Sequence, residues 1–182
     1  NSFRLTPRAL EFSAAYLSSD IIPTVMSPLV KRISDEIHEA CAAAVLDGDN
    51  IVMVARASPA RALSGDMAIG HRLPAACTAL GRVLIDVAQL NAAPLKAITP
   101  FTIVDYEVLK ARIIADQAQG FSVVDQEAEV GFRSIAVPVY RHDKLLACAI
   151  HVGAHTERVS VGRMIDEFLP LLRSAAEEAK SM

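Results

Sequence analysis

The chain has 182 residues, of which 52% are hydrophobic and 21% charged, a composition that excludes a disordered protein and fits one domain with a buried core. Its formal net charge of −3 lacks the basic excess that phosphate binding requires, so this stretch is a poor candidate for direct DNA contact. Cys41, Cys77 and Cys148 are widely spaced and form no CxxC motif, which indicates free thiols in a reducing compartment. No apolar run reaches the roughly 18 residues of a membrane span, and we expect a soluble, cytoplasmic protein.

The first forty residues predict two helices. Thr6 is a candidate N-cap and Pro7 a candidate first helical residue, and apolar residues follow at helical spacing as far as Leu17. Three polar residues then end this helix, and a second amphipathic pattern covers about 23–40. We therefore expect two helices before the first strand.

The rest of the chain predicts an antiparallel sheet with further helices. Two short β-type runs, 42–46 and 51–55, flank a turn-forming cluster and indicate a hairpin. Further predicted elements are strands at 67–73, 121–125, 132–140 and 145–152, helices at 74–87, 106–119 and about 160–178, and a loop at 91–105. Antiparallel strands with helices at both ends of the chain favour an α+β fold over a doubly wound parallel sheet.

Two of the predicted strands carry polar residues on one face. In the strand 132–140, Ser134 shares a shallow face with small residues, whereas Arg133 points to the opposite side. His151 interrupts a later apolar strand and points to the same side as Gly153. A partly charged His151 would stabilise a ligand carboxylate, although a lone strand histidine is more often structural. A shallow polar face suits a small-molecule pocket, and it equally suits a closely packed helix.

Small residues at the start of the predicted helix 74–87 also leave two interpretations open. Ala75, Ala76, Thr78 and Ala79 would let an anionic ligand approach exposed backbone amides, or would let the helix pack closely on the sheet. Cys77 lies at the same place, where a helix N-terminus lowers the pKa of a thiol. Burial as a small apolar side chain is the more common outcome for such a cysteine.

The sequence does not support catalysis, a metal or a cofactor. Arg133 is placed to pair with a ligand carboxylate or with Glu127 or Glu129, and the acidic run 125–129 is typical of a solvated turn. There is no GxSxG, Walker A or Rossmann glycine motif. The spacing of three nearby histidines matches no common zinc pattern; these are His142, His151 and His155.

Five motifs occur along the chain in a characteristic order. They are RLTPRALEF, AVLDGDNIVMVAR, GHRLPAACTALGRVLI, QGFSVVDQEAEVGFRSIAVPVY and VSVGRMIDEFLPLLRSAA. Together they closely resemble the C-terminal effector domain of the isocitrate-lyase-regulator (IclR) family of bacterial transcription factors. The resemblance implies a GAF-like domain, with a ligand held between the concave face of a curved antiparallel sheet and the LPAACTALG segment.

The same resemblance implies a domain organisation and partners. Residues 1–20 would form a linker helix after a missing N-terminal winged helix-turn-helix, and residues 21–182 would form the effector-binding domain. The implied partners are a small organic acid, a second copy of the chain in a homodimer or homotetramer, and DNA only through the missing domain. No membrane contact is implied.

The resemblance also implies a set of ligand-binding residues. They are a position near Leu73, then Ala79, Leu80, Val124 or its neighbour Asp125, Ser134, His151 and Gly153. The motifs are most similar to the branch that controls catabolism of aromatic acids such as protocatechuate and hydroxybenzoates. An apolar slot for the ring would come from Leu63, Leu73, Ala79 and Leu80, and the carboxylate would meet His151, Arg133 or the amides at Thr78.

Two other functions remain open on the residues alone. One is a thiol-dependent enzyme or redox sensor that uses Cys77. The other is a module in which the first and last helices only mediate oligomerisation. A non-enzymatic ligand sensor is the function that we expect.

Overall fold

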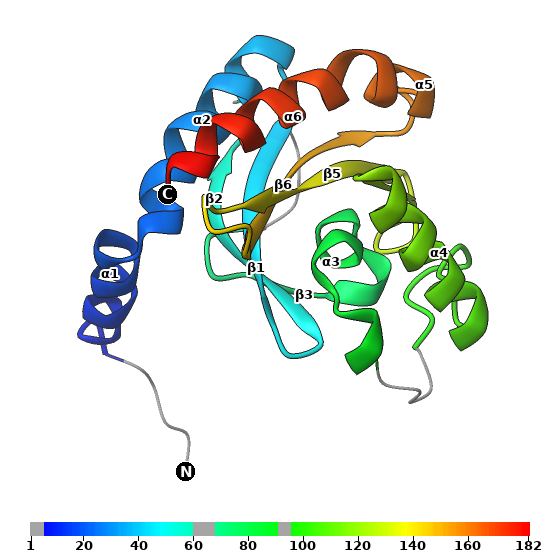
Figure 1. Cartoon of the computed structure of the whole chain (residues 1–182), viewed down its shortest axis with the longest axis horizontal. Helices are drawn as coiled ribbons and strands as arrows, with labels where there is room; N and C mark the ends of the chain where they lie inside the picture. The colour runs from blue at the N-terminus through cyan, green and yellow to red at the C-terminus, as the bar shows by residue number, and fades with distance from the viewer. Residues whose placement is uncertain (1–5, 60–67, 91–95) are drawn as a thin grey trace.

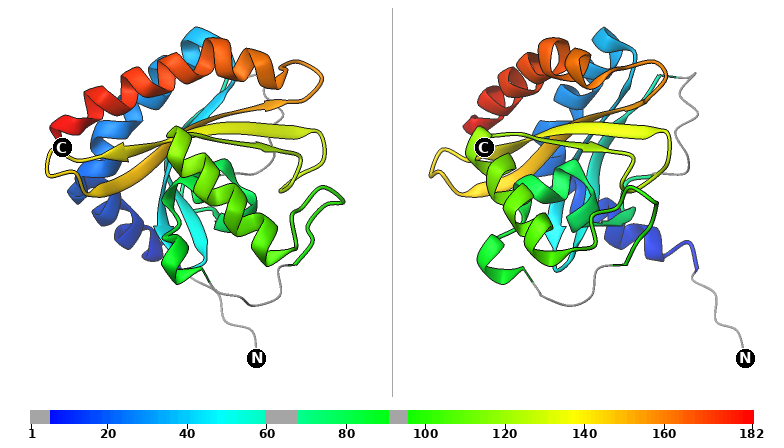
Figure 2. Two further views of the ribbon diagram at one scale, coloured as in Figure 1. Left: turned by 45° about the vertical axis from the view of Figure 1, so that its right-hand side comes forward. Right: turned by 90° about the vertical axis from the view of Figure 1, so that its right-hand side faces the viewer.

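A six-stranded antiparallel sheet forms the centre of the protein. The computed structural model describes residues 6–59, 68–90 and 96–182. Within them the strands lie in the order β3, β2, β1, β6, β5, β4, so the hairpins β1–β2 and β5–β6 meet at the middle of the sheet. Figures 1 and 2 show a curved sheet with helices on both faces. The predicted α+β fold is thus confirmed.

The strand boundaries follow the predicted pattern with small shifts. The strands are β1 (Ala40–Asp47), β2 (Asn50–Ala57), β3 (Arg72–Pro74), β4 (Ser122–Asp125), β5 (Phe132–Tyr140) and β6 (Leu146–His155). Gly48, with φ of +60°, forms the tight turn of the β1–β2 hairpin, a conformation that costs glycine little. The strand predicted at 67–73 is confined to β3 within the described residues, and Met67 lies outside them.

Helices cover both faces of the sheet (Figure 1). Their bounds are α1 (Ala9–Ser19), α2 (Ile21–Ile37), α3 (Ala79–Leu84), α4 (Tyr106–Gln119), α5 (Val161–Arg163) and α6 (Leu169–Glu178). Helices α2 and α6 cover one face, and α3 and α4 lie over the other. Asp20 caps α2 by accepting a hydrogen bond from the Ile22 amide at 2.8 Å, and Gly120 ends α4 at φ +78°.

The helix predicted over 74–87 is wrong, because the structure divides it into separate pieces. A 3-10 turn covers Ala75–Cys77, Thr78 is extended, α3 follows, and a second 3-10 turn covers Val87–Gln89. A Cβ atom on Gly81 would lie 2.1 Å from the Ala75 carbonyl oxygen. The first turn of α3 therefore folds back directly on the 3-10 turn, which a straight helix would not allow. The helix predicted at about 160–178 is confirmed: the chain is helical from Val161 to Glu178, with a π-helical turn over Met164–Phe168.

Two apolar clusters lie on the two sides of the sheet. On the side of α2 and α6, Ile135 and Val137 of β5 and Ile150 of β6 pack with Phe168 and Leu172. On the side of α3, the buried apolar residues of the same strands are small, such as Ala136 and Ala149. Because side chains alternate along a strand, the same sequence supplies large residues to one face and small residues to the other.

Helix α1 lies apart from both clusters. It extends from the start of α2 away from the sheet, as Figure 1 shows, and exposes most of the Phe12 and Leu10 side chains. Among the described residues, no helix is both long and apolar enough to cross a membrane. None of the described His, Cys, Asp and Glu side chains form a group of three that could hold a metal ion.

Candidate ligand-binding site

The concave face of the sheet has a floor of small side chains. Strand pairing aligns Ala42 of β1 with His151 of β6, and His151 with Ala136 of β5. One step along, Ala44 is aligned with Ala149. Side chains this small leave space between the sheet and α3. Larger side chains at the same positions would contact that helix.

A pocket occupies this space beneath α3. The empty space between the lining residues is about 530 Å³ when the open solvent at the mouth is included. The described residues that line it are Ile51, Met53, Leu73, Cys77, Thr78, Leu80, Val124, Ala128, Glu129, Phe132, Ser134 and His151. These described lining residues include no lysine or arginine.

Thr78 fixes the helix wall of the pocket. Its hydroxyl accepts a hydrogen bond from the Gly81 amide at 3.1 Å and donates one to the Ala75 carbonyl at 3.2 Å. The hydroxyl is therefore satisfied within the protein. The amides of Ala79 and Leu80 belong to the first turn of α3, which has no earlier helical carbonyls to pair with.

Cys77 lines the pocket as a buried thiol. It ends the 3-10 turn instead of starting a helix, and its Sγ lies 3.5 Å from the Pro74 carbonyl oxygen. Burial raises the pKa of this thiol, and the negative charge of Glu127 adds to the effect. That change is opposite to the one that a nucleophilic or redox-active cysteine needs, so the structure does not favour the thiol chemistry considered above.

His151 is the most buried polar side chain on the pocket floor. Burial, together with the nearby positive charge of Arg56, which is aligned with His151 across Ala42, lowers the pKa of its imidazole to about 4. The ring is therefore neutral near pH 7, and the partial charge expected from the sequence is absent. Within the described part of the chain no hydrogen bond joins the ring nitrogens of His151 or Oγ of Ser134 to another residue, and both side chains line the pocket, so both can bond to a ligand in neutral form.

Phe132 closes one end of the pocket, and Gly153 makes room for it. A Cβ atom on Gly153 would lie 2.3 Å from Cζ of the Phe132 ring. The ring therefore lies directly against the glycine backbone. Gly153 thus shapes the site by lacking a side chain, and it is not itself among the lining residues.

Arg133 lies on the other face of the sheet, as alternation along β5 predicts. Its Nε and Nη2 donate to the two carboxylate oxygens of Asp125, each at 3.1 Å, and its Nη1 donates to the Val159 carbonyl at 3.0 Å. The internal partner expected from the sequence was Glu127 or Glu129, and that expectation is wrong. Neither Arg133 nor Asp125 lines the pocket, because each faces away from it.

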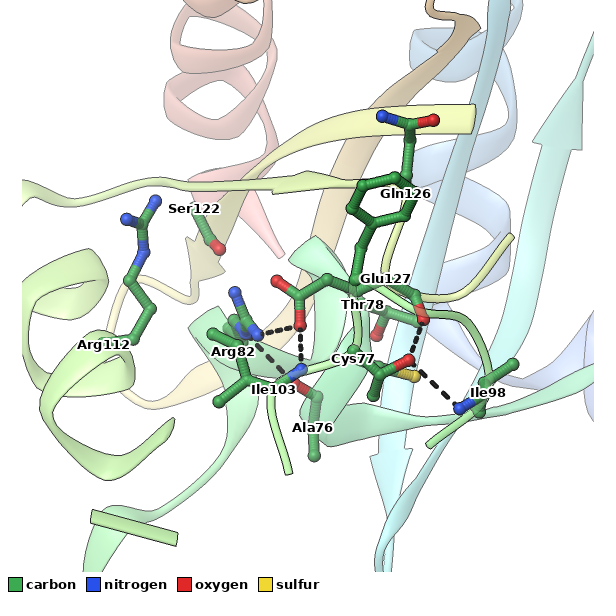
Figure 3. Close-up of polar contacts among 12 residues, drawn as sticks. Ala76, Cys77, Thr78, Arg82, Ile98, Ile103, Arg112, Ser122, Gln126 and Glu127 are labelled. Carbon is green, nitrogen blue, oxygen red and sulfur yellow. Dashed lines mark hydrogen bonds and ion pairs between the residues drawn. The ribbon is translucent and has the colours of Figure 1, made fainter. Parts of the chain in front are cut away.

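A buried ion pair lies beside the pocket (Figure 3). Arg82 Nη2 donates to Glu127 Oε2 at 2.6 Å, and both side chains are more than nine-tenths buried. Arg82 Nε also donates to the Ala76 carbonyl at 3.0 Å, and Glu127 Oε2 accepts from the Ile103 amide at 3.2 Å. One ion pair thus joins α3, the β4–β5 turn and the segment before α4.

The structure brings together six of the proposed ligand-binding residues. Leu73, Thr78, Leu80, Val124, Ser134 and His151 all line the pocket. Ala79 is buried in the adjoining cluster, and Leu63 lies outside the described residues. The lining residues that the sequence did not single out include Phe132, Met53, Ala128 and Glu129. Phe132 and Ser134 are two positions apart in one strand and therefore face the same side of the sheet. This alternation could have identified Phe132 as a lining residue.

The fold and the pocket define a class of protein: an α+β domain that holds a small molecule between a curved antiparallel sheet and a short helix. Residues 14–180 match the family model described as bacterial transcriptional regulator IclR C-terminal. The chain belongs to this family.

Curated relatives agree with this assignment. The chain is 41% identical over 185 residues to the Pca regulon regulatory protein of Pseudomonas putida, covering 97% of this chain and 64% of that protein. It is 32% identical to the p-hydroxybenzoate hydroxylase transcriptional activator of Acinetobacter baylyi, covering 99% of this chain and 71% of the relative. The chain therefore spans about two thirds of the length of these regulators.

Solved structures share the fold. A putative transcriptional regulator from Rhodococcus sp. RHA1 matches 99% of this chain and 76% of its own, with 35% identity and a TM-score of 0.88. The inducer-binding domain of the Acinetobacter regulator PobR, a double mutant in complex with 3-hydroxybenzoic acid, matches 89% of this chain and 99% of its own. Its identity is 29% and its TM-score 0.80.

Proposed function

We propose that this chain senses a small aromatic carboxylic acid, such as a hydroxybenzoate or protocatechuate, as the effector-binding domain of a cytoplasmic bacterial transcription regulator. The observation that carries the proposal is the pocket over the small-residue floor, where two polar side chains, Ser134 and His151, lie among apolar walls. A benzoate ring fits such walls, and its polar substituents need a few placed donors and acceptors. The complex of PobR with 3-hydroxybenzoic acid supports this ligand class.

The polar groups of the pocket suggest how the ligand lies. A neutral His151 suits a ring hydroxyl, because an imidazole can donate to or accept from a neutral group equally well. We assign the carboxylate to the amides of Ala79 and Leu80 in the first turn of α3. Leu73 and Leu80 would contact the ring.

Titration calorimetry tests the proposal directly. The panel would contain 3- and 4-hydroxybenzoate, protocatechuate and aliphatic keto acids, with phenol as the ligand that lacks a carboxylate. We expect a hydroxybenzoate to bind more tightly than phenol and more tightly than the aliphatic acids. A chain to which no organic acid binds even in the millimolar range would contradict the proposal.

The remaining partners belong to the full-length protein. We infer that residues 1–20 link this domain to an N-terminal DNA-binding domain, and that the regulator acts as a homodimer or homotetramer. The greater length of the curated relatives supports the first inference. Light scattering of the full-length protein, with and without its ligand, would test the second.

A further inference from the structure

Two walls of the pocket come from segments that are far apart in the sequence. One is the 3-10 turn and the start of α3, which contribute Cys77, Thr78 and Leu80. The other is the turn between β4 and β5, which contributes Ala128 and Glu129. Neither segment is part of the sheet ladder, so strand pairing does not fix the distance between them.

The Arg82–Glu127 ion pair connects these two walls. Arg82 holds the Ala76 carbonyl, one residue before Cys77, while the same guanidinium holds Glu127, one residue before Ala128. The planar fork of an arginine allows both bonds at once in a fixed geometry. Figure 3 shows the Glu127 carboxylate between the Arg82 guanidinium and the Ile103 amide.

A third segment is fastened to the same turn. The Glu127 carbonyl accepts a hydrogen bond from the Thr102 hydroxyl at 2.7 Å, and the Gln126 carbonyl accepts one from the Thr99 hydroxyl at 2.7 Å. The Thr102 hydroxyl in turn accepts from the Thr99 amide at 2.9 Å. The turn that forms the second wall is thus fixed from both sides.

We propose that Arg82 and Glu127 are a positioning pair, which sets the separation of the two pocket walls and so determines how tightly the pocket holds a small aromatic acid. The part of this inference that concerns affinity rests on the proposed function. Neither side chain lines the pocket, so neither is expected to touch the ligand. The pair acts through Cys77 and Ala128, the residues next to those it holds.

The Cys77 thiol gives a readout that needs no ligand. It lines the first wall and is buried, so its alkylation by iodoacetamide reports how far the walls open. The test variant is Arg82→Met/Glu127→Leu, in which an apolar pair replaces both charges and leaves none buried alone. Glu127 raises the pKa of Cys77 and Arg82 lowers it, so removing both together largely cancels their direct effects on the thiol.

The control variant is Leu172→Ala, a truncation of a fully buried side chain on the opposite face of the sheet. At temperatures that give the two variants equal stability, we expect Cys77 to be alkylated roughly tenfold faster in the double variant. We also expect the double variant to bind 3-hydroxybenzoate roughly tenfold more weakly than Leu172→Ala does. Equal alkylation rates in the two variants would overturn the proposal. Faster alkylation of the double variant with no loss of affinity for 3-hydroxybenzoate would overturn it as well.

Arg82→Lys keeps the inference testable if the double variant does not fold. Lysine retains the charge opposite Glu127 but cannot hold that carboxylate and the Ala76 carbonyl in one fixed fork. Alkylation of Cys77 should then rise about threefold, and alkylation at the wild-type rate would overturn the proposal. A separate outcome is that the wild-type protein binds no aromatic acid while the variant is still alkylated faster than wild type. That result would support the positioning role and contradict the proposed ligand.

Discussion

On one face of the sheet, Ile135, Val137 and Ile150 pack against α2 and α6, whereas on the other face their sequence neighbours Ala136 and Ala149 lie below a pocket. The two faces use the same strands and the same backbone hydrogen bonds. They differ in the volume of alternate side chains and in polarity, because the pocket face also carries Ser134 and His151. The difference shows how one sheet provides both stability and a binding site, because filling one face and leaving the other shallow requires nothing more than alternation.

This division predicts that the two faces respond differently to substitution. Changes on the filled face should alter the free energy of unfolding and leave ligand affinity unchanged. Changes on the pocket face should alter affinity more than they alter stability. Distant sites without shared partners usually behave additively, so the two effects can be measured separately.

The largest effect is expected on the filled face. Ile150→Ala removes a fully buried side chain next to α6 and should lower the free energy of unfolding by about 2–5 kcal/mol. Chemical denaturation measures the loss, and calorimetry at a temperature where the variant is folded measures affinity. Affinity for a hydroxybenzoate should stay within about twofold of wild type. A tenfold loss of affinity would show that the two faces are not independent.

A slightly smaller effect concerns protonation of His151. Its pKa is about 4 in the folded protein, below the ordinary histidine value of 6.5 that the unfolded chain keeps, so the unfolded chain binds more protons at pH values between the two. The stabilisation associated with the neutral ring is therefore complete above pH 6.5 and decreases as the pH falls toward 4. The total change is about 3 kcal/mol, because a pKa difference of one corresponds to about 1.4 kcal/mol.

His151→Gln isolates this contribution because glutamine does not titrate. Denaturation curves between pH 4 and 7 should show the wild-type stability falling more steeply with acid than that of the variant. Every other titrating group is common to both proteins, so the difference between the curves belongs to His151. Parallel curves would mean that the ring is not buried as the structure shows.

Gly153→Ala should alter the shape of the pocket. The new Cβ would overlap the Phe132 ring, so the ring has to move, at a cost of about 1–3 kcal/mol in stability. Because Phe132 lines the pocket, affinity for an aromatic acid should fall roughly tenfold. Phe132→Leu in the same chain should recover part of the stability, and a double-mutant cycle would measure this coupling. Strict additivity would contradict the packing of the ring on the glycine.

The alternation that separates the two faces could be predicted from the sequence. The polarity and size pattern of residues 132–140 places Ser134 and Arg133 on opposite sides, which is where the structure has them. Strand periodicity depends only on near neighbours in the chain, and local sequence reports those directly.

Features that depend on distant contacts could not be predicted in this way. The break at Thr78 follows from the close approach of Gly81 to Ala75, and helical periodicity carries no sign of it. The Arg82–Glu127 pair joins residues 45 positions apart, and an arginine in a helical pattern normally indicates an exposed face. The neutral state of His151 follows from burial, which needs the complete fold.

The smallest predicted effect lies at the mouth of the pocket, where Glu129 is exposed among the lining residues. Its carboxylate and the ligand carboxylate have the same charge, so Glu129→Gln should strengthen binding of a hydroxybenzoate. Exposed charges interact weakly, by less than about 1 kcal/mol, and the gain should therefore be at most about fivefold. Raising the ionic strength from about 0.01 to about 0.15 M shortens the screening length from roughly 30 to roughly 8 Å and should reduce the gain.

Hydroxybenzamide provides the matched control because it has the same shape without the charge. Its affinity should be the same for wild type and Glu129→Gln at both ionic strengths. A gain for the amide equal to the gain for the acid would mean that Glu129 acts through the shape of the mouth. In that case the pocket face, like the filled face, would be governed by side-chain volume alone.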